Sequence, residues 1–168
     1  MKKIAILSAA LLLVGVVVQV SLASSRSNDS VLKFKTMAPV TGPFVGTANP
    51  IRDISGGGLP WQLAKGEGEL RSDGSLEVKV KGLVLFDGAP VPPALQGTNP
   101  IPDFKAVVSC LTTVNGSATT SNVSTAAFPA TSTGDAKIEA SVALPSPCFA
   151  PIVFVTSTTG AWFAVTGR

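Results

Sequence analysis

Two carboxylates, Glu67 and Glu69, are the first residues that could do chemistry, because they share one face of a predicted strand. Two acids on one face can serve as the acid and the nucleophile of a glycosidase. A general acid needs a raised pKa, and the nearby Arg71, Lys79 and Lys81 favour ionised glutamates. The pattern favours a solvated charged face, so a carboxylate-based hydrolase is the least favoured of three function classes.

The absence of histidine and tyrosine from the chain removes most other catalytic chemistry. His-based triads and His-ligated zinc or copper sites cannot be built. Asp53, Asp87 and Asp103 fall in predicted loops and could contribute to a calcium site, but no dense run of oxygen ligands accompanies them. We therefore predict a protein that is not an enzyme, with no metal and no cofactor.

Cys110 and Cys148 are the only cysteines. An even number of cysteines in an exported chain predicts a disulfide. The bridge would be worth about 4 kcal/mol in the chain-entropy model. The alternative, a redox pair, lacks the C-x-x-C spacing.

Trp61 and Trp162 are the only tryptophans. An exposed indole could stack on a sugar ring, which would make the protein a carbohydrate-binding domain. Core packing is the favoured interpretation of both residues.

The start of the chain has the pattern of a secretory signal peptide. Lys2 and Lys3 precede an apolar run at 4–20, and Ser21-Leu22-Ala23 is a small-x-small cleavage site. We predict residues 1–23 as the signal peptide and an exported product, secreted or held at the cell envelope. The short lysine-rich start is typical of a bacterial protein. The alternative is an uncleaved anchor; after cleavage no membrane span is expected.

The predicted mature chain begins with a flexible lead-in at 24–30, followed by one domain at 31–168. Loss of Lys2 and Lys3 lowers the formal net charge from +3 to +1. No cluster of basic residues remains, so no nucleic-acid partner is expected.

The stretch Lys65 to Leu85 predicts a β-hairpin. A two-residue Asp73-Gly74 turn would mix polar and apolar residues on both faces. A three-residue loop at 72–74, with Gly74 in the left-handed conformation, separates them. This register pairs Leu70 with Leu76, Gly68 with Val78, Gly66 with Val80, Glu67 with Lys79, and Glu69 with Glu77. The two inward glycines leave room for a large side chain, for which Trp61 and Phe104 are candidates.

Loops separate the remaining predicted strands. Residues 44–48 are predicted as a short strand and 49–60 as a loop. The stretch 87–102 contains five prolines, which exclude a central strand. Its apolar residues Val91, Leu95 and Ile101 either cap the end of the domain or form an exposed patch for a partner, which makes this a possible binding loop.

Two turns fix the pairing of the later strands. Asn115-Gly116 predicts a two-residue turn that pairs Val108 with Val123 and points Cys110 into the core. Residues 152–157 are apolar on both faces and are predicted to lie centrally. A three-residue loop ending at Gly160 would pair Val155 with Phe163 and Val153 with Val165, and would place Trp162 on the face opposite to Phe163.

These patterns predict an all-β fold. Apolar residues alternate with a period of two, and Thr, Val and Gly dominate. About eight short strands indicate a single antiparallel β-sandwich. A small β-barrel is the alternative.

Two resemblances accompany this prediction. The segments Leu59-Pro60-Trp61, Val107-Val108-Ser109-Cys110, Pro147-Cys148 and 160–164 resemble a group of uncharacterised secreted bacterial proteins. The run G-x-G-x-x-x-S-D-G-x-L-x-V-x-V-x-G-L, at 66–83, is similar to the opening hairpin of the chordin-type secreted domain. Such domains usually continue into a His-rich stretch that this chain lacks, and neither resemblance implies an activity. The favoured function is a non-catalytic secreted or envelope-associated module that binds a protein or glycan through its loops.

Overall fold

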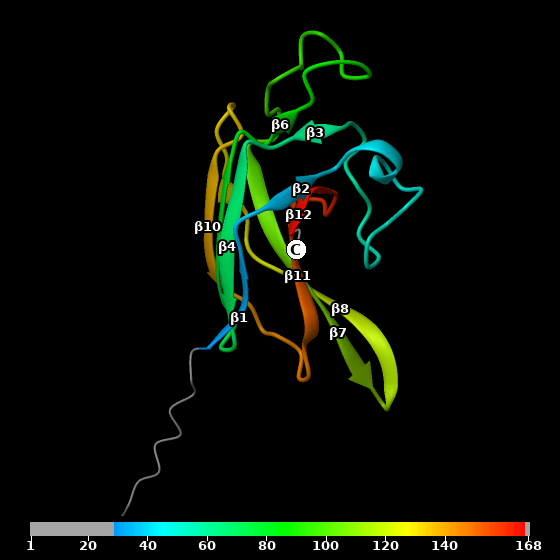
Figure 1. Ribbon diagram of the computed structural model, residues 1–168, viewed down its shortest axis with the longest axis vertical. Coiled ribbons are helices and arrows are strands. Elements are labelled where there is room, and N and C mark those ends of the chain that lie inside the picture. Colours follow the sequence, from blue (N-terminus) through cyan, green and yellow to red (C-terminus); the bar gives the residue numbers. More distant parts are fainter. Residues whose placement is uncertain (1–28, 167–168) are drawn as a thin grey trace, which may run out of the picture.

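The computed structural model describes residues 29–166, which form an all-β structure (Figure 1). The predicted signal peptide and residues 24–28 of the predicted lead-in lie outside this range. The first strand begins at Ser30, one residue before the predicted start of the domain. Among residues 29–166, no helix is long and apolar enough to cross a membrane.

Two antiparallel sheets pack face to face, with a small third sheet at one end (Figure 1). The first sheet has the order β1-β4-β5-β10, and the second has the order β2-β12-β11-β7-β8 with β9 also paired to β7. The first sheet contains β1 (Ser30–Phe34), β4 (Lys65–Arg71), β5 (Ser75–Lys81) and β10 (Ala136–Ser141). The second contains β2 (Met37–Pro39), β7 (Asp103–Val114), β8 (Ser117–Ser124), β9 (Phe128–Pro129), β11 (Phe149–Thr156) and β12 (Trp162–Thr166). The third pairs β3 (Trp61–Gln62) with β6 (Val84–Leu85). The predicted sandwich architecture is confirmed, and within the described residues the sheets do not close into a barrel.

The β4–β5 hairpin has the predicted register. Leu70 pairs with Leu76, Gly68 with Val78 and Gly66 with Val80. Gly74 has φ +87°, which is the left-handed conformation that the three-residue loop requires. The prediction of what fills the space above the glycines is wrong. Met37 of β2, in the opposite sheet, lies over Gly66, and Phe34 of β1, the strand paired with β4, lies over Gly68.

We expect substitutions at these two glycines to have unequal effects on stability. A Cβ atom at position 68 would lie 2.2 Å from the backbone oxygen of Glu77, which cannot move without disturbing the sheet. A Cβ atom at position 66 would lie 2.7 Å from Cγ and 2.9 Å from Cβ of Met37, so it would push a side chain and not the backbone of a paired strand. Gly68→Ala should therefore lower the free energy of unfolding by about 3 kcal/mol, and Gly66→Ala by about 1 kcal/mol. Urea denaturation of the two variants makes the comparison, and equal losses would contradict it.

The core contains an aromatic cluster of Trp61, Phe104 and Phe163. The rings of Trp61 and Phe163 are stacked with centroids 4.0 Å apart, and Phe104 meets both edge-on. Strand β11 lies centrally in the second sheet, as its apolar composition predicts.

The predicted register between β11 and β12 is only partly correct. The three-residue loop at 158–160 is confirmed, since Ser157 and Ala161 flank it and Thr156 pairs with Trp162. Beyond that pair a β-bulge shifts the register by one residue, so Val155 faces Ala164 and not Phe163. The bulge inserts Phe163 as an extra residue, whose ring joins the cluster between the sheets. Trp162 contacts Phe154 on the other face of the sheet, as predicted.

The segment 42–58 forms a cover over the outer face of the second sheet. A 3-10 turn at Gly42–Phe44 replaces the strand predicted at 44–48. The ring of Phe44 lies 6.4 Å from that of Trp162, and the backbones of Gly57 and Ser55 bond to Trp162. Gly42, Pro43 and Gly46 disfavour a regular strand here.

The loop at 87–102 forms no strand, as predicted, and lies at one end of the sandwich (Figure 1). Its three apolar side chains do not share an exposed patch. Val91 is buried in the core at 2% exposure, Ile101 is half-buried against the core, and Leu95 remains exposed. This loop caps the core.

Candidate interaction surface

The outer face of the first sheet carries all four glutamates of the chain, interleaved with cations. Glu67 lies 3.0 Å from Lys65, and Glu69 lies 3.4 Å from Arg71. A hydrogen bond from Ser30, then the bond and the charge of Arg71, hold the pKa of Glu69 below its ordinary value. This shift is opposite to the one that a general acid needs. The arrangement is that of a solvated charged face.

Both tryptophans lie in the core. Trp61 is 3% exposed and Trp162 is 2% exposed. Neither indole presents a face to solvent, so neither can stack on a sugar ring in this structure. Within residues 29–166, no three His, Cys, Asp or Glu residues lie together in a group that could hold a metal ion.

An exposed apolar pair lies on the second sheet. Leu111 of β7 and Phe149 of β11 are direct cross-strand partners on the outer face. Leu111 is 44% exposed and Phe149 is 59% exposed, and segment 42–58 leaves both uncovered. Large apolar side chains that stay together in solvent mark candidate sites for a partner. We call these two residues the Leu111–Phe149 pair.

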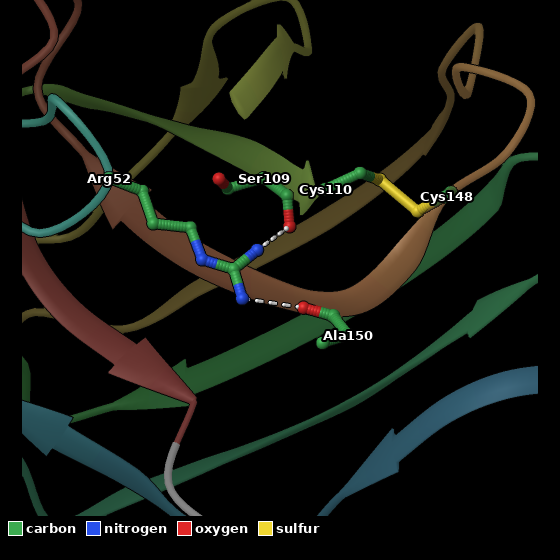
Figure 2. Close-up of a disulfide and its surroundings, with 5 residues drawn as sticks. All are labelled: Arg52, Ser109, Cys110, Cys148 and Ala150. Carbon is green, nitrogen blue, oxygen red and sulfur yellow. Dashed lines mark hydrogen bonds between the residues drawn. A yellow bond between two sulfur atoms is a disulfide. The ribbon is translucent and has the colours of Figure 1, made fainter. Parts of the chain in front are cut away.

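A disulfide fixes the backbone beneath this pair. Cys110 and Cys148 are bonded, as predicted, with their Cα atoms 5.0 Å apart. Each cysteine immediately precedes one member of the pair. Because side chains alternate along a strand, the bridge lies toward the core while Leu111 and Phe149 point outward. The covalent link, which Figure 2 shows, thereby fixes β7 and the start of β11 next to the pair.

Arg52 holds the same two strands from outside the sheet. Its Nη1 donates to the backbone oxygen of Ser109 at 3.0 Å, and its Nη2 donates to that of Ala150 at 2.8 Å (Figure 2). Ala150 lies in a β-bulge of β11, with φ +42°. An alanine in this left-handed region costs about 1–2 kcal/mol. The guanidinium stabilises the bulge by bonding to the carbonyl of the strained residue.

The turn that carries Arg52 is also strained. Arg52 has φ +49° and Asp53 has φ +67°, between Ile51 and Ile54, whose backbones exchange two hydrogen bonds of 3.0 Å. The side chain of Asn122 on β8 donates to the backbone oxygen of Arg52 at 2.9 Å. Strained backbone that persists is characteristic of sites where geometry serves function. Through Arg52, this turn bonds to Ser109 and Ala150, which lie within two residues of Leu111 and Phe149.

Sequence reasoning found the disulfide and missed the other parts of this surface. Leu111 carried a usable signal, since it is an apolar residue on the outward face of β7, between Ser109 and Thr113. Phe149 and Arg52 carried none, because a bulge and an irregular loop set their positions. No known protein family, curated protein or solved structure matches this chain.

Arg52→Gln should lower the free energy of unfolding by about 1–3 kcal/mol, since glutamine is too short to reach both carbonyl oxygens and loses the charge-assisted bonds. Lys105→Gln is the matched control. Lys105 also donates to a backbone oxygen, that of Thr158, but this is a single exposed bond, 3.4 Å long. Its loss should cost less than about 0.5 kcal/mol. Thermal and urea unfolding measure the stability of both variants. An Arg52→Gln protein as stable as the unmodified chain would show that the bonds of the guanidinium do not contribute to stability.

Proposed function

We propose that this protein is an exported, non-catalytic module that binds another protein through the Leu111–Phe149 pair. The observation that carries the proposal is the exposure of two large apolar side chains on a frame fixed by a disulfide and by Arg52. A rigid backbone beneath Leu111 and Phe149 lowers the entropic cost of binding, because the two strands lose little conformational freedom when a partner binds.

Export to the outside of the cell or to the envelope of a bacterium is part of this proposal. A disulfide is compatible with an oxidising compartment. The predicted signal peptide at 1–23 supports the same location.

A carbohydrate-binding domain is the rival function, and it is not favoured. It relied on Trp61 or Trp162 as a stacking surface, and both indoles are buried. A hydrolase that relies on Glu67 or Glu69 is also not favoured, because cations neighbour both and the pKa of Glu69 is lowered.

The test uses the mature chain from Ser24, immobilised and incubated with envelope and culture-medium proteins of the source organism. The variant is Leu111→Ser/Phe149→Ser. Val31→Ser/Phe86→Ser is the matched control, since Val31 and Phe86 are comparably exposed but lie elsewhere. A partner captured by the unmodified chain is then purified, and its affinity for all three proteins is measured by calorimetry.

We expect the control to bind like the unmodified chain and the Leu111→Ser/Phe149→Ser variant to bind at least 10-fold more weakly. Each buried apolar side chain contributes about 1.5–3 kcal/mol. Equal binding by all three proteins would refute the assignment of this surface. Binding to glycans on an array, unaffected by the double substitution, would refute the protein-partner class.

A further inference from the structure

The free edge of β8 has features that the other sheet edges lack. Within the described residues, the outer strands of the two main sheets are β1, β10, β2, β8 and the two-residue β9, which contains Pro129. Strand β1 carries Lys33 and an irregular register, β10 carries Lys137 and Glu139, and β2 has three residues including Pro39. Charges, bulges, shortness and proline all discourage pairing with another strand.

Strand β8 has none of these protections. Its sequence SATTSNVS contains no charged residue and no proline over eight residues. Its pairing with β7 runs from Val107 opposite Ser124 to Val114 opposite Ser117 without a register shift. No residue of β8 is fully buried, and the β7–β8 hairpin projects away from the rest of the molecule (Figure 1).

The backbone groups that face outward can be assigned. In a two-residue hairpin the residues that flank the turn, Val114 and Ser117, form a hydrogen-bonded pair. Odd-numbered residues of β8 therefore direct their N–H and C=O groups toward β7, and Thr125 continues this pattern by donating to the Ala106 oxygen at 2.9 Å. The even-numbered residues direct theirs to solvent. They are Ala118, Thr120, Asn122 and Ser124.

We propose that β8 pairs antiparallel with β8 of a second copy of this chain, about a two-fold axis that passes beside Ser121. In this register Ala118 faces Ser124 of the second copy, and Thr120 faces Asn122. Four outward residues on each copy, each with one N–H and one C=O, then exchange eight hydrogen bonds. The strand is self-complementary, because it carries no charged residue and its facing pairs, which also include Thr119 with Val123, combine side chains of moderate size.

The dimer joins the two second sheets into one continuous sheet. Antiparallel β8–β8 contact is isologous, so it closes at two copies and does not propagate. A contact of one strand with one strand buries much less than the roughly 2,000 Å² or more of permanent dimers. We therefore expect dissociation on dilution, with a dissociation constant on the order of micromolar.

The test introduces charged residues at Ala118 and Ser124, which face each other across the proposed interface. Ala118→Lys/Ser124→Lys sets lysine against lysine twice in the dimer, and Ala118→Glu/Ser124→Glu sets glutamate against glutamate. The dissociation constant of each variant alone, measured by sedimentation velocity over a dilution series, should be at least 10-fold larger than that of the unmodified chain. An equimolar mixture should form the mixed dimer. Thr113→Lys/Val114→Lys is the control, since it adds the same charge to exposed positions of β7, one strand from the edge.

Hydrogen exchange gives a second reading of the same interface. The amides of Thr120 and Asn122 should exchange quickly in dilute protein and slowly at high concentration, while the amides of Thr119 and Ser121 stay protected by β7 throughout. A mature chain that remains monomeric at about 100 µM refutes the proposal. A dissociation constant that is unchanged in both charged variants refutes it too, because the interface of the dimer must then lie elsewhere. Neither result bears on the Leu111–Phe149 pair, which is tested by the affinity of its partner.

Discussion

Replacing Cys110 and Cys148 with alanine should lower the free energy of unfolding by about 4 kcal/mol, which is a large part of the total stability of a domain of this size. The bridge spans a sequence separation of 38 residues that includes β8 and β10. Without it, the unfolded chain gains the freedom of that loop. Urea denaturation of the mature chain measures the loss.

Reduction of the unmodified protein is the control for the cysteine substitutions. If the bridge acts by restricting the unfolded chain, dithiothreitol and the double substitution should lower stability by similar amounts. A double variant within about 1 kcal/mol of the oxidised protein would refute this role. Because Cys110 is fully buried, a single Cys110→Ser variant should be worse than the double alanine variant, since it buries a hydroxyl in the core.

Phe163→Ala should cost about 3–5 kcal/mol, because it removes the ring on which Trp61 stacks and leaves a cavity between the sheets. Phe163 is 4% exposed and also meets Phe104 edge-on. The fluorescence of the folded variant should be more easily quenched by acrylamide than that of the unmodified chain, since the face of Trp61 loses its cover.

Phe86→Ala is the matched control for this loss. Phe86 is 40% exposed, so the same change of side chain should cost about 1 kcal/mol or less. Similar losses at both positions would show that Phe163 contributes no more than an exposed phenylalanine, and the described core would then be wrong.

The hairpins could be predicted from the sequence because short turns fix a register. Once Gly74 takes its left-handed conformation, every pair along β4 and β5 follows, and Asn115-Gly116 does the same for β7 and β8. The disulfide followed from the count of cysteines and the expected compartment. In each case, turn residues or the number of cysteines were enough to predict the feature.

The bulges could not be predicted, and they determine the candidate surface. A bulge adds one residue without a composition signal, as at Phe163, where the predicted loop is right and the pairing beyond it is wrong. The bulge at Ala150 uses an alanine where glycine would be expected. Arg52 holds that bulge from a loop about a hundred residues earlier in the chain, which is a tertiary contact that no local pattern encodes.

The contacts of Arg52 make the frame of this surface insensitive to acid. Backbone carbonyls accept both of its bonds, and a carbonyl has no proton to gain as the surroundings turn acidic. Burial lowers the pKa of Arg52 from its ordinary value, and the guanidinium still keeps its charge in acidic and neutral solution. A carboxylate in place of these carbonyls would become protonated in acid, and its ion pair with Arg52 would be lost. With no histidine anywhere in the chain, we expect the exposed leucine and phenylalanine to keep one geometry in acidic and in neutral solution.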